Sequence, residues 1–206
     1  MGDDRSEEQA ILRAAFRVIG SSPDGSTSVA DILGEAGLST RAFYRHFRSK
    51  DELIVAWLRS PQARWIDIIT TGLDEDRTPP ARALVAFWDR LGDWAEAEGY
   101  LGCPYLKTLA EVEEPFHVAR LEVAAFVREV DDFFTRTATA CGFQRPRELG
   151  LRLRLLTMGA LTAIVVERSR EPLDRARDVT VHLLASWQGM SRSGMEAFIA
   201  GSTPGR

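Results

Sequence analysis

The chain is poor in the residues that form metal centres and disulfide frameworks. Among its 206 residues there are two cysteines and three histidines. Cys103 and Cys141 form no Cys-x-x-Cys pair and have no histidine at ligand spacing, so neither a disulfide framework nor a zinc site is indicated, and a reducing cytoplasm is expected. We interpret each cysteine as a small buried hydrophobic residue, with a redox-sensing thiol as the alternative.

Long apolar runs are also missing. The first ten residues are acidic and contain no apolar block behind a basic start, so we expect no export signal. The most apolar run, residues 159–166, is far shorter than the roughly 20 residues that cross a bilayer. The sequence therefore predicts no membrane span and a cytoplasmic protein.

Signatures of catalysis are absent as well. The sequence has no Gly-x-Ser-x-Gly elbow, phosphate loop or His-Glu-x-x-His pair, and His46, His117 and His182 are scattered along it. Glu113 and His117 have metal-ligand spacing on a helix, but Pro115 between them argues against one continuous turn. We expect no enzyme, no cofactor and no metal.

Helical periodicity is what the sequence does have, with no convincing alternation of apolar and polar residues, and this predicts an all-α fold. A first helix has an apolar stripe from Ile11 to Ile19. A second begins at Ser28, which can cap it with Asp31, and ends at Gly37. A third is capped by Ser39 or Thr40 and runs to Phe47, and a Ser49–Glu52 capping box starts a fourth.

Prolines and glycines divide the remainder of the chain. Pro61 should interrupt the helix that follows residue 51, and Pro79-Pro80 can start the next one. Gly102-Cys103-Pro104 breaks the chain again, and Pro115, Pro146 and Pro172 each lie where a helix could begin. We expect an N-terminal three-helix helix-turn-helix domain over residues 1–50 and a larger helical domain over residues 51–206.

The distribution of charge differs from the net charge of −4. Residues 39–50 contain Arg41, Arg45, Arg48 and Lys50 and no acid. Two short helices joined at Gly37 form a helix-turn-helix, whose second helix can enter the major groove of DNA. Acids elsewhere need not prevent binding, because charges interact over a Debye length of about 10 Å.

Residues 28–53 closely resemble the DNA-binding segment of the TetR family of bacterial transcriptional regulators. The matching parts are the turn at residues 36–38, the Phe-Tyr-Arg-His-Phe core at 43–47 and the Ser-Lys-Asp-Glu-Leu cap at 49–53. Leu33 departs from the pattern, since the family usually has alanine at that position. The resemblance covers about the first fifty-five residues.

This resemblance implies roles for individual side chains. Tyr44 and Lys50 would contact phosphates, as Ser28 could, while Thr40, Arg41 and Arg45 are candidates for base edges or neighbouring phosphates. Alternatives remain: Tyr44 as a packed aromatic, His46 as a surface or packed histidine, and Lys50 serving its own helix start. The full set of candidates for DNA binding is Ser28, Ser39, Thr40, Arg41, Tyr44, Arg45, His46 and Lys50.

The resemblance also implies a homodimer in which the last two long helices pair with their copies and a near-palindromic operator in double-stranded DNA. Two apolar stripes are suitable, although an intrachain core is the alternative for either. The candidate interface residues are Leu153, Leu156, Ala160, Ala163, Ile164, Val179, Leu183 and Trp187.

Aromatic residues are frequent in the larger domain, where the family holds a small, often apolar ligand. We place Trp65, Trp88, Phe126 and Met158 near such a pocket, with ordinary core packing as the alternative for each. The predicted function is a ligand-responsive regulator, in most family members a repressor. The alternative is a helical dimer that acts through protein partners without reading DNA.

Overall fold

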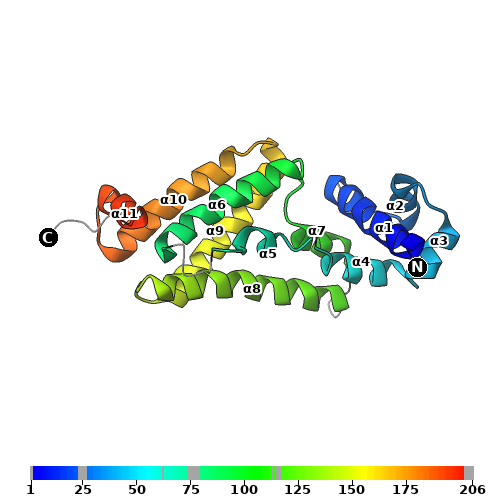
Figure 1. Ribbon diagram of the computed structural model, residues 1–206, viewed down its shortest axis with the longest axis horizontal. Coiled ribbons are helices and arrows are strands. Elements are labelled where there is room, and N and C mark those ends of the chain that lie inside the picture. Colours follow the sequence, from blue (N-terminus) through cyan, green and yellow to red (C-terminus); the bar gives the residue numbers. More distant parts are fainter. Residues whose placement is uncertain are drawn as a thin grey trace. The chain divides into compact units, whose positions relative to one another are not determined.

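The computed structural model describes residues 2–22, 27–61, 63–73, 79–112, 114 and 117–201. These residues form eleven helices and no strand, which confirms the predicted all-α class (Figure 1). The chain contains two compact units. Unit 1 comprises residues 1–64 and 101–126, and unit 2 comprises residues 65–100 and 127–206. Both units are discontinuous in sequence, and a domain boundary after residue 50 stays a prediction.

Unit 1 begins with the three helices expected from the sequence: α1 (Gly2–Ser21), α2 (Val29–Ala36) and α3 (Thr40–His46). The predicted stripe of α1 is buried at Ile11, Ala15 and Ile19, and α1 contacts both α2 and α3. Leu33 is also buried, so the larger side chain at this position of α2 is accommodated in the core.

Short-range capping fixes the ends of α2 and α3. The Ser28 hydroxyl oxygen accepts the Asp31 N–H at 3.1 Å, and the Asp31 carboxylate accepts the Ser28 N–H at 3.0 Å. Gly37 ends α2 in the left-handed conformation with φ +66°, which favours glycine. Ser39 then caps α3 by accepting the Ala42 N–H at 3.2 Å. The predicted caps of both helices are confirmed.

Unit 1 extends past residue 50 because later helices complete its core. Helices α4 (Lys50–Leu58) and α7 (Pro104–Glu111) contact α1 and each other, and the first residues of α8 (Val118–Ala140) belong to the same unit. The Tyr105 hydroxyl donates to the Leu58 carbonyl at 2.7 Å. A three-helix head would leave the buried apolar face of α4 exposed, so the compact unit includes these partners.

Unit 2 contains α5 (Trp65–Thr70), α6 (Pro80–Ala97), the rest of α8, α9 (Pro146–Glu167), α10 (Glu171–Gln188) and α11 (Arg192–Ile199). Helix α10 packs against α6, α9 and α11, and α5 packs against α6 (Figure 1). As predicted, the chain is interrupted near Pro61, and prolines lie in the first turns of α6, α9 and α10. The break predicted at residues 102–104 is also the start of a helix, because Pro104 is the first residue of α7. Pro115 lies outside the described residues.

Helix α9 is apolar over a longer stretch than the uninterrupted apolar run of residues 159–166 suggests. An 18-residue window within it has a mean hydropathy of 1.7, so by length and composition alone it could span a bilayer, and 39% of the window is buried. The expectation based on residues 159–166 missed this because it counted only uninterrupted apolar residues. Core helices of soluble proteins meet the same criterion. Arginines in the left-handed conformation flank the helix: Arg145 has φ +49° and Arg168 has φ +48°.

Candidate nucleic-acid interface

Helix α3 separates its apolar residues from a polar face. Ala42 and Phe43 are buried, as the sequence predicts, while Thr40, Arg41 and Tyr44 are exposed. Tyr44 is 64% exposed, and its ring lies edge-on against Phe43 with centroids 5.3 Å apart. An exposed phenol on a ring supported by Phe43 fits a phosphate contact, and it fits equally the alternative of a packed aromatic with its hydroxyl in water.

The C-terminal end of α3 is held by α1. Glu7 of α1 accepts a hydrogen bond from the Arg45 guanidinium, and its Oε2 lies 3.3 Å from His46 Nε2. The His46 side chain is only 7% exposed. These hydrogen bonds from Arg45 and His46 lower the pKa of Glu7, so its carboxylate is ionised at neutral pH. His46 is thus a packed histidine in this structure, and Arg45 is already engaged by a carboxylate.

The hydroxyls of Ser28 and Ser39 participate in helix capping. Ser28 Oγ donates to Asp31 at 2.6 Å while accepting the Asp31 N–H, so it has no second proton for a phosphate. The hydrogen bonds that the Ser28 hydroxyl and the Ser28 backbone N–H donate to the Asp31 carboxylate lower the pKa of Asp31. The Ser39 hydroxyl accepts the Ala42 N–H and keeps its own proton available. Lys50 is half-buried at the first position of α4.

Two arginines of the acid-free run, residues 39–50, have side chains with no hydrogen-bonding or ionic partner among the described residues. They are Arg41 on α3 and Arg48 between α3 and α4, and both are exposed. Arg48 was not among the predicted DNA-binding residues, although it belongs to the same acid-free run. Glu7 was also missed, because a residue 38 positions before Arg45 gives no local signal of contact.

Two further acids of unit 1 are paired with neighbours. Glu35 of α2 bonds to Arg17 of α1 at 2.6 Å. Asp51 of α4 lies 3.2 Å from Nε2 of His117, whose Nδ1 accepts the Ala119 N–H at the start of α8. The imidazole is thereby used in helix capping. Glu113, which the sequence suggested as a metal ligand together with His117, lies outside the described residues. The described residues contain no cluster suited to a metal ion.

The predicted ligand residues do not come together in one unit. Trp65 and Trp88 are buried in unit 2, where both contact Phe87 with ring centroids 6.3 and 5.4 Å away. Met158 is half-buried on α9 in the same unit. Phe126, however, belongs to unit 1 and stacks on Tyr105 at 3.8 Å. Counting aromatic residues could not distinguish a core partner of Tyr105 from a pocket residue.

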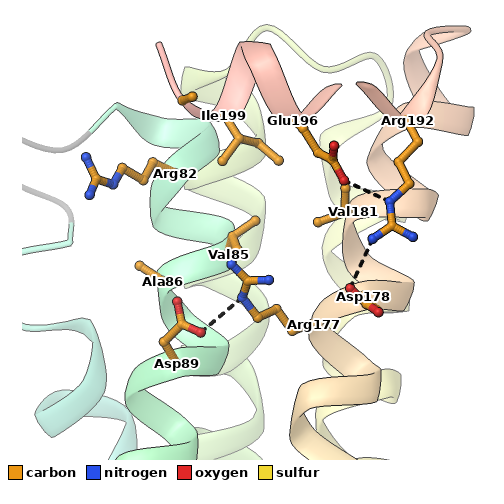
Figure 2. Close-up of a pocket in the computed structure, with 11 residues that line it drawn as sticks. Arg82, Val85, Ala86, Asp89, Arg177, Asp178, Val181, Arg192, Glu196 and Ile199 are labelled. Atoms are coloured by element: carbon orange, nitrogen blue, oxygen red, sulfur yellow. Dashed lines mark hydrogen bonds and ion pairs between the residues drawn. The ribbon is translucent and has the colours of Figure 1, made fainter. Parts of the chain in front are cut away.

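A hollow of about 610 Å³ lies elsewhere in unit 2, among α6, α10 and α11 (Figure 2). Its apolar lining includes Val85, Val181 and Ile199, and Arg177 crosses from α10 to Asp89 of α6 at 3.0 Å. None of the four predicted pocket residues lines it.

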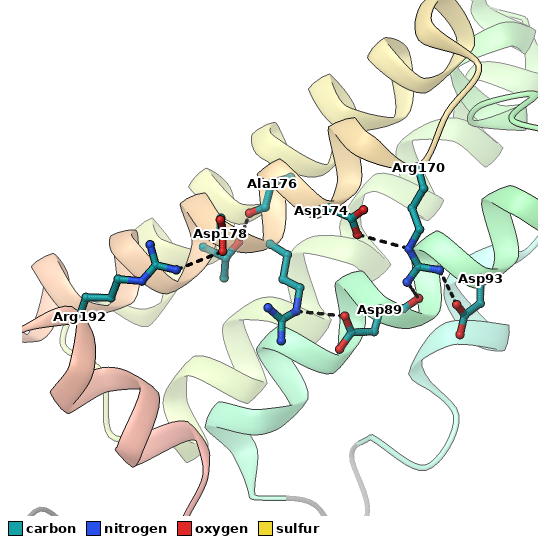
Figure 3. A network of polar contacts seen from close by, with 9 residues as sticks. Asp89, Asp93, Arg170, Asp174, Ala176, Asp178 and Arg192 are labelled. Atoms are coloured by element: carbon teal, nitrogen blue, oxygen red, sulfur yellow. Dashed lines mark hydrogen bonds and ion pairs between the residues drawn. The ribbon is translucent and has the colours of Figure 1, made fainter.

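An arginine joins α6 to the start of α10 (Figure 3). Arg170 donates to Asp93 at 2.6 Å, to the Asp89 carbonyl at 2.9 Å and to Asp174 at 3.3 Å. The hydrogen bond to Asp93 is the main cause that raises the pKa of Arg170. The guanidinium lies over Gly92, where an added Cβ would come within 2.5 Å of Arg170 Cζ. Glycine at this position provides the space for the guanidinium.

The predicted dimer stripe requires correction. Leu153 and Ile164 are completely buried within the chain and Ala160 is nearly so, so they cannot bury further surface on a partner. Leu156, Ala163 and Leu183 are half-buried, and Trp187 is covered by the guanidinium groups of Arg145 and Arg152 at 4.9 and 4.7 Å. Val179 is 50% exposed. The outward apolar residues of α9 are Leu151, Leu155 and Val166.

The cysteines are shielded. Cys103 is buried, and desolvation by burial raises the pKa of Cys141 to about 12. A thiol with such a pKa has almost no thiolate at neutral pH, which disfavours the redox-sensing alternative.

Comparisons with known proteins identify the family. Residues 11–57 match the family model of bacterial regulatory proteins, tetR family. No curated protein matches the chain. Similar solved structures include TetR-family regulators from Streptomyces coelicolor (26% identity, TM-score 0.69, 85% of this chain and 97% of that chain), Chloroflexus aurantiacus (25%, 0.71, 87% and 94%) and Agrobacterium tumefaciens (19%, 0.71, 94% and 97%). The helix-turn-helix with its exposed, acid-free α3 agrees with these matches: residues 11–57 are a DNA-binding domain of the TetR family, and over most of its length the chain is similar to TetR-family transcriptional regulators.

Proposed function

We propose that this regulator is a cytoplasmic repressor that binds a near-palindromic operator as a homodimer and is released by a small, largely apolar effector. TetR-family regulators are soluble proteins and not enzymes. The observation that carries the proposal is the face of α3, where Thr40, Arg41 and Tyr44 are exposed on a run without acids. Hydroxyl and guanidinium groups are suited to phosphates and to base edges in the major groove.

The apolar outer face of α9 supports a homodimer. Leu155 is 60% exposed and Val166 is 81% exposed, and Leu151 lies on the same side one turn before Leu155. Val179 of α10 adds a further exposed apolar side chain. Pairing these helices with their copies would remove this surface from water. A two-fold dimer would present two α3 helices to successive major grooves about 34 Å apart.

The aromatic cluster of unit 2 supports an apolar effector. Trp88 and Trp94 are buried, and their indole N–H groups have no hydrogen-bond partner among the described residues. An apolar molecule with one acceptor oxygen would satisfy such a group while packing on Trp65 or Trp88. The effector must bind one spacing of the two α3 helices better than the other, since equal affinity would shift neither population.

The proposal is tested by selecting bound sequences from random duplex DNA and titrating the best site at several salt concentrations. We expect a palindromic site, and we expect Arg41→Ala, Tyr44→Ala and Lys50→Ala each to weaken binding by about tenfold, as for a lost direct contact. Arg128→Ala is the matched control, because it removes an exposed arginine from α8 and leaves the helix-turn-helix unchanged. No enrichment, or binding indifferent to the three head substitutions, would favour a dimer that acts through protein partners.

A further inference from the structure

The contact between α1 and the end of α3 points to a role for a residue outside the helix-turn-helix. Glu7 lies on α1, and its Oε2 contacts both Arg45 and His46. We propose that Glu7 tunes the sequence-independent affinity of the helix-turn-helix: it holds Arg45 and His46 against α1, which limits attraction to phosphates and leaves DNA reading to the N-terminal half of α3. This inference rests on the proposed DNA-binding function and specifies how its head is tuned.

Burial and charge explain why Glu7 competes well with DNA. The Glu7 side chain is 23% exposed and that of His46 only 7%, so the contact is partly shielded from water. Arg45 remains 47% exposed and lies within the acid-free run, where a phosphate could otherwise attract it. Moving Arg45 to a phosphate would break a charge-assisted hydrogen bond and leave the Glu7 carboxylate uncompensated near a polyanion.

The division along α3 has a consequence for recognition. Arg41 and Tyr44 have no such acidic partner among the described residues, and both are exposed. A guanidinium that binds any phosphate adds affinity for every sequence equally. Restraining Arg45 therefore lowers the affinity for every duplex and leaves the contacts that distinguish bases unchanged, so Glu7 sets the part of the affinity that does not depend on sequence.

The test measures binding of the full-length protein to the selected operator and to a random duplex over a range of salt concentrations. In Glu7→Gln and Glu7→Ala we expect random-duplex affinity to rise several-fold and the log–log salt slope to steepen by about 0.9, as for one additional phosphate contact. Operator affinity should rise by the same factor and the operator-to-random ratio should stay unchanged, because the added phosphate contact is common to both duplexes. Thermal unfolding of each variant establishes that the head remains folded.

Two further variants separate this role from general electrostatics. Glu35→Gln removes one negative charge and one ion pair, between α1 and α2, without touching α3, and should leave the salt slope unchanged. The sequence placed Arg45 among the DNA contacts, but Glu7 restrains it in this structure. Arg45→Ala should therefore alter operator affinity by no more than about twofold, and combined with Glu7→Gln it should abolish the gain. A loss of about tenfold in Arg45→Ala alone would show a direct contact and overturn the proposal.

The outcomes distinguish this inference from the proposed function. If Arg41→Ala weakens operator binding while Glu7→Gln leaves random-duplex binding and its salt slope unchanged, the role of Glu7 is wrong and the regulator stands. If no operator is enriched, the proposed function fails. The Glu7 proposal is then judged on the random duplex alone, where Glu7→Gln must still raise affinity through Arg45.

Discussion

At the scale of single residues, Gly92 and Arg170 show how one side chain depends on the absence of another. Gly92 lies inside α6, where glycine is disfavoured relative to alanine by about 1 kcal/mol. Its missing Cβ leaves room for the guanidinium that bonds Asp93, Asp174 and the Asp89 carbonyl. The position of the guanidinium therefore opposes the gain in helix propensity that a Cβ would bring here.

This dependence predicts different effects in two backgrounds. In the wild type Gly92→Ala should change the free energy of unfolding little, because the Cβ displaces the mobile end of Arg170 from its acceptors and this loss offsets the gain in helix propensity of about 1 kcal/mol. In an Arg170→Ala background the same substitution should raise it by up to about 1 kcal/mol, because only the helix propensity remains. Urea unfolding of the four proteins measures both values. Equal effects in the two backgrounds would show that the close approach is not what selects glycine.

At the scale of elements, the sequence predicted the helix ends, which depend on neighbouring residues, but not the contacts between helices. The caps at Ser28 and Ser39 and the left-handed Gly37 were predictable, because each depends on residues within three positions. The contact of Glu7 with Arg45 and the stacking of Phe126 on Tyr105 depend on tertiary packing, which periodicity does not encode. The same limitation applies to α9, whose apolar residues surround much of the helix, so the sequence could not identify its outward face.

The ends of α9 provide a prediction about stability. Arg168 ends the helix in the left-handed conformation, in which a non-glycine residue is disfavoured by about 1 kcal/mol. Arg168→Gly should therefore raise the free energy of unfolding by about that amount. Arg145→Gly is the matched control. It also relieves a positive φ but loses the bond to Glu148 at 2.9 Å and the contact with Trp187, so it should gain less. Thermal unfolding compares the two, and an equal or larger gain for Arg145→Gly would contradict this account.

At the scale of the whole molecule, the proposed homodimer predicts different effects for substitutions at two leucines that lie one half-turn apart on α9. Leu155 is 60% exposed and Leu153 is completely buried. Leu155→Asp should yield a folded monomer, because a charge placed on the outer face opposes pairing but is solvated in the single chain. Leu153→Asp should instead lower stability severely, because it buries an unpaired carboxylate. Light scattering after gel filtration and circular dichroism separate these results, and a Leu155→Asp protein that stayed dimeric would place the interface elsewhere.

The interleaved composition of the two units also bears on synthesis by the ribosome. Helices α1 to α4 emerge first, but Tyr105 and Phe126, which complete the core of unit 1, follow only after residues 65–100 of the other unit. At about 5–20 residues per second, the nascent head waits several seconds for these partners. Neither unit can therefore finish folding as a continuous N-terminal segment. A chimera that exchanged only residues 1–50 would graft a new head onto α7 and α8 residues suited to the original one.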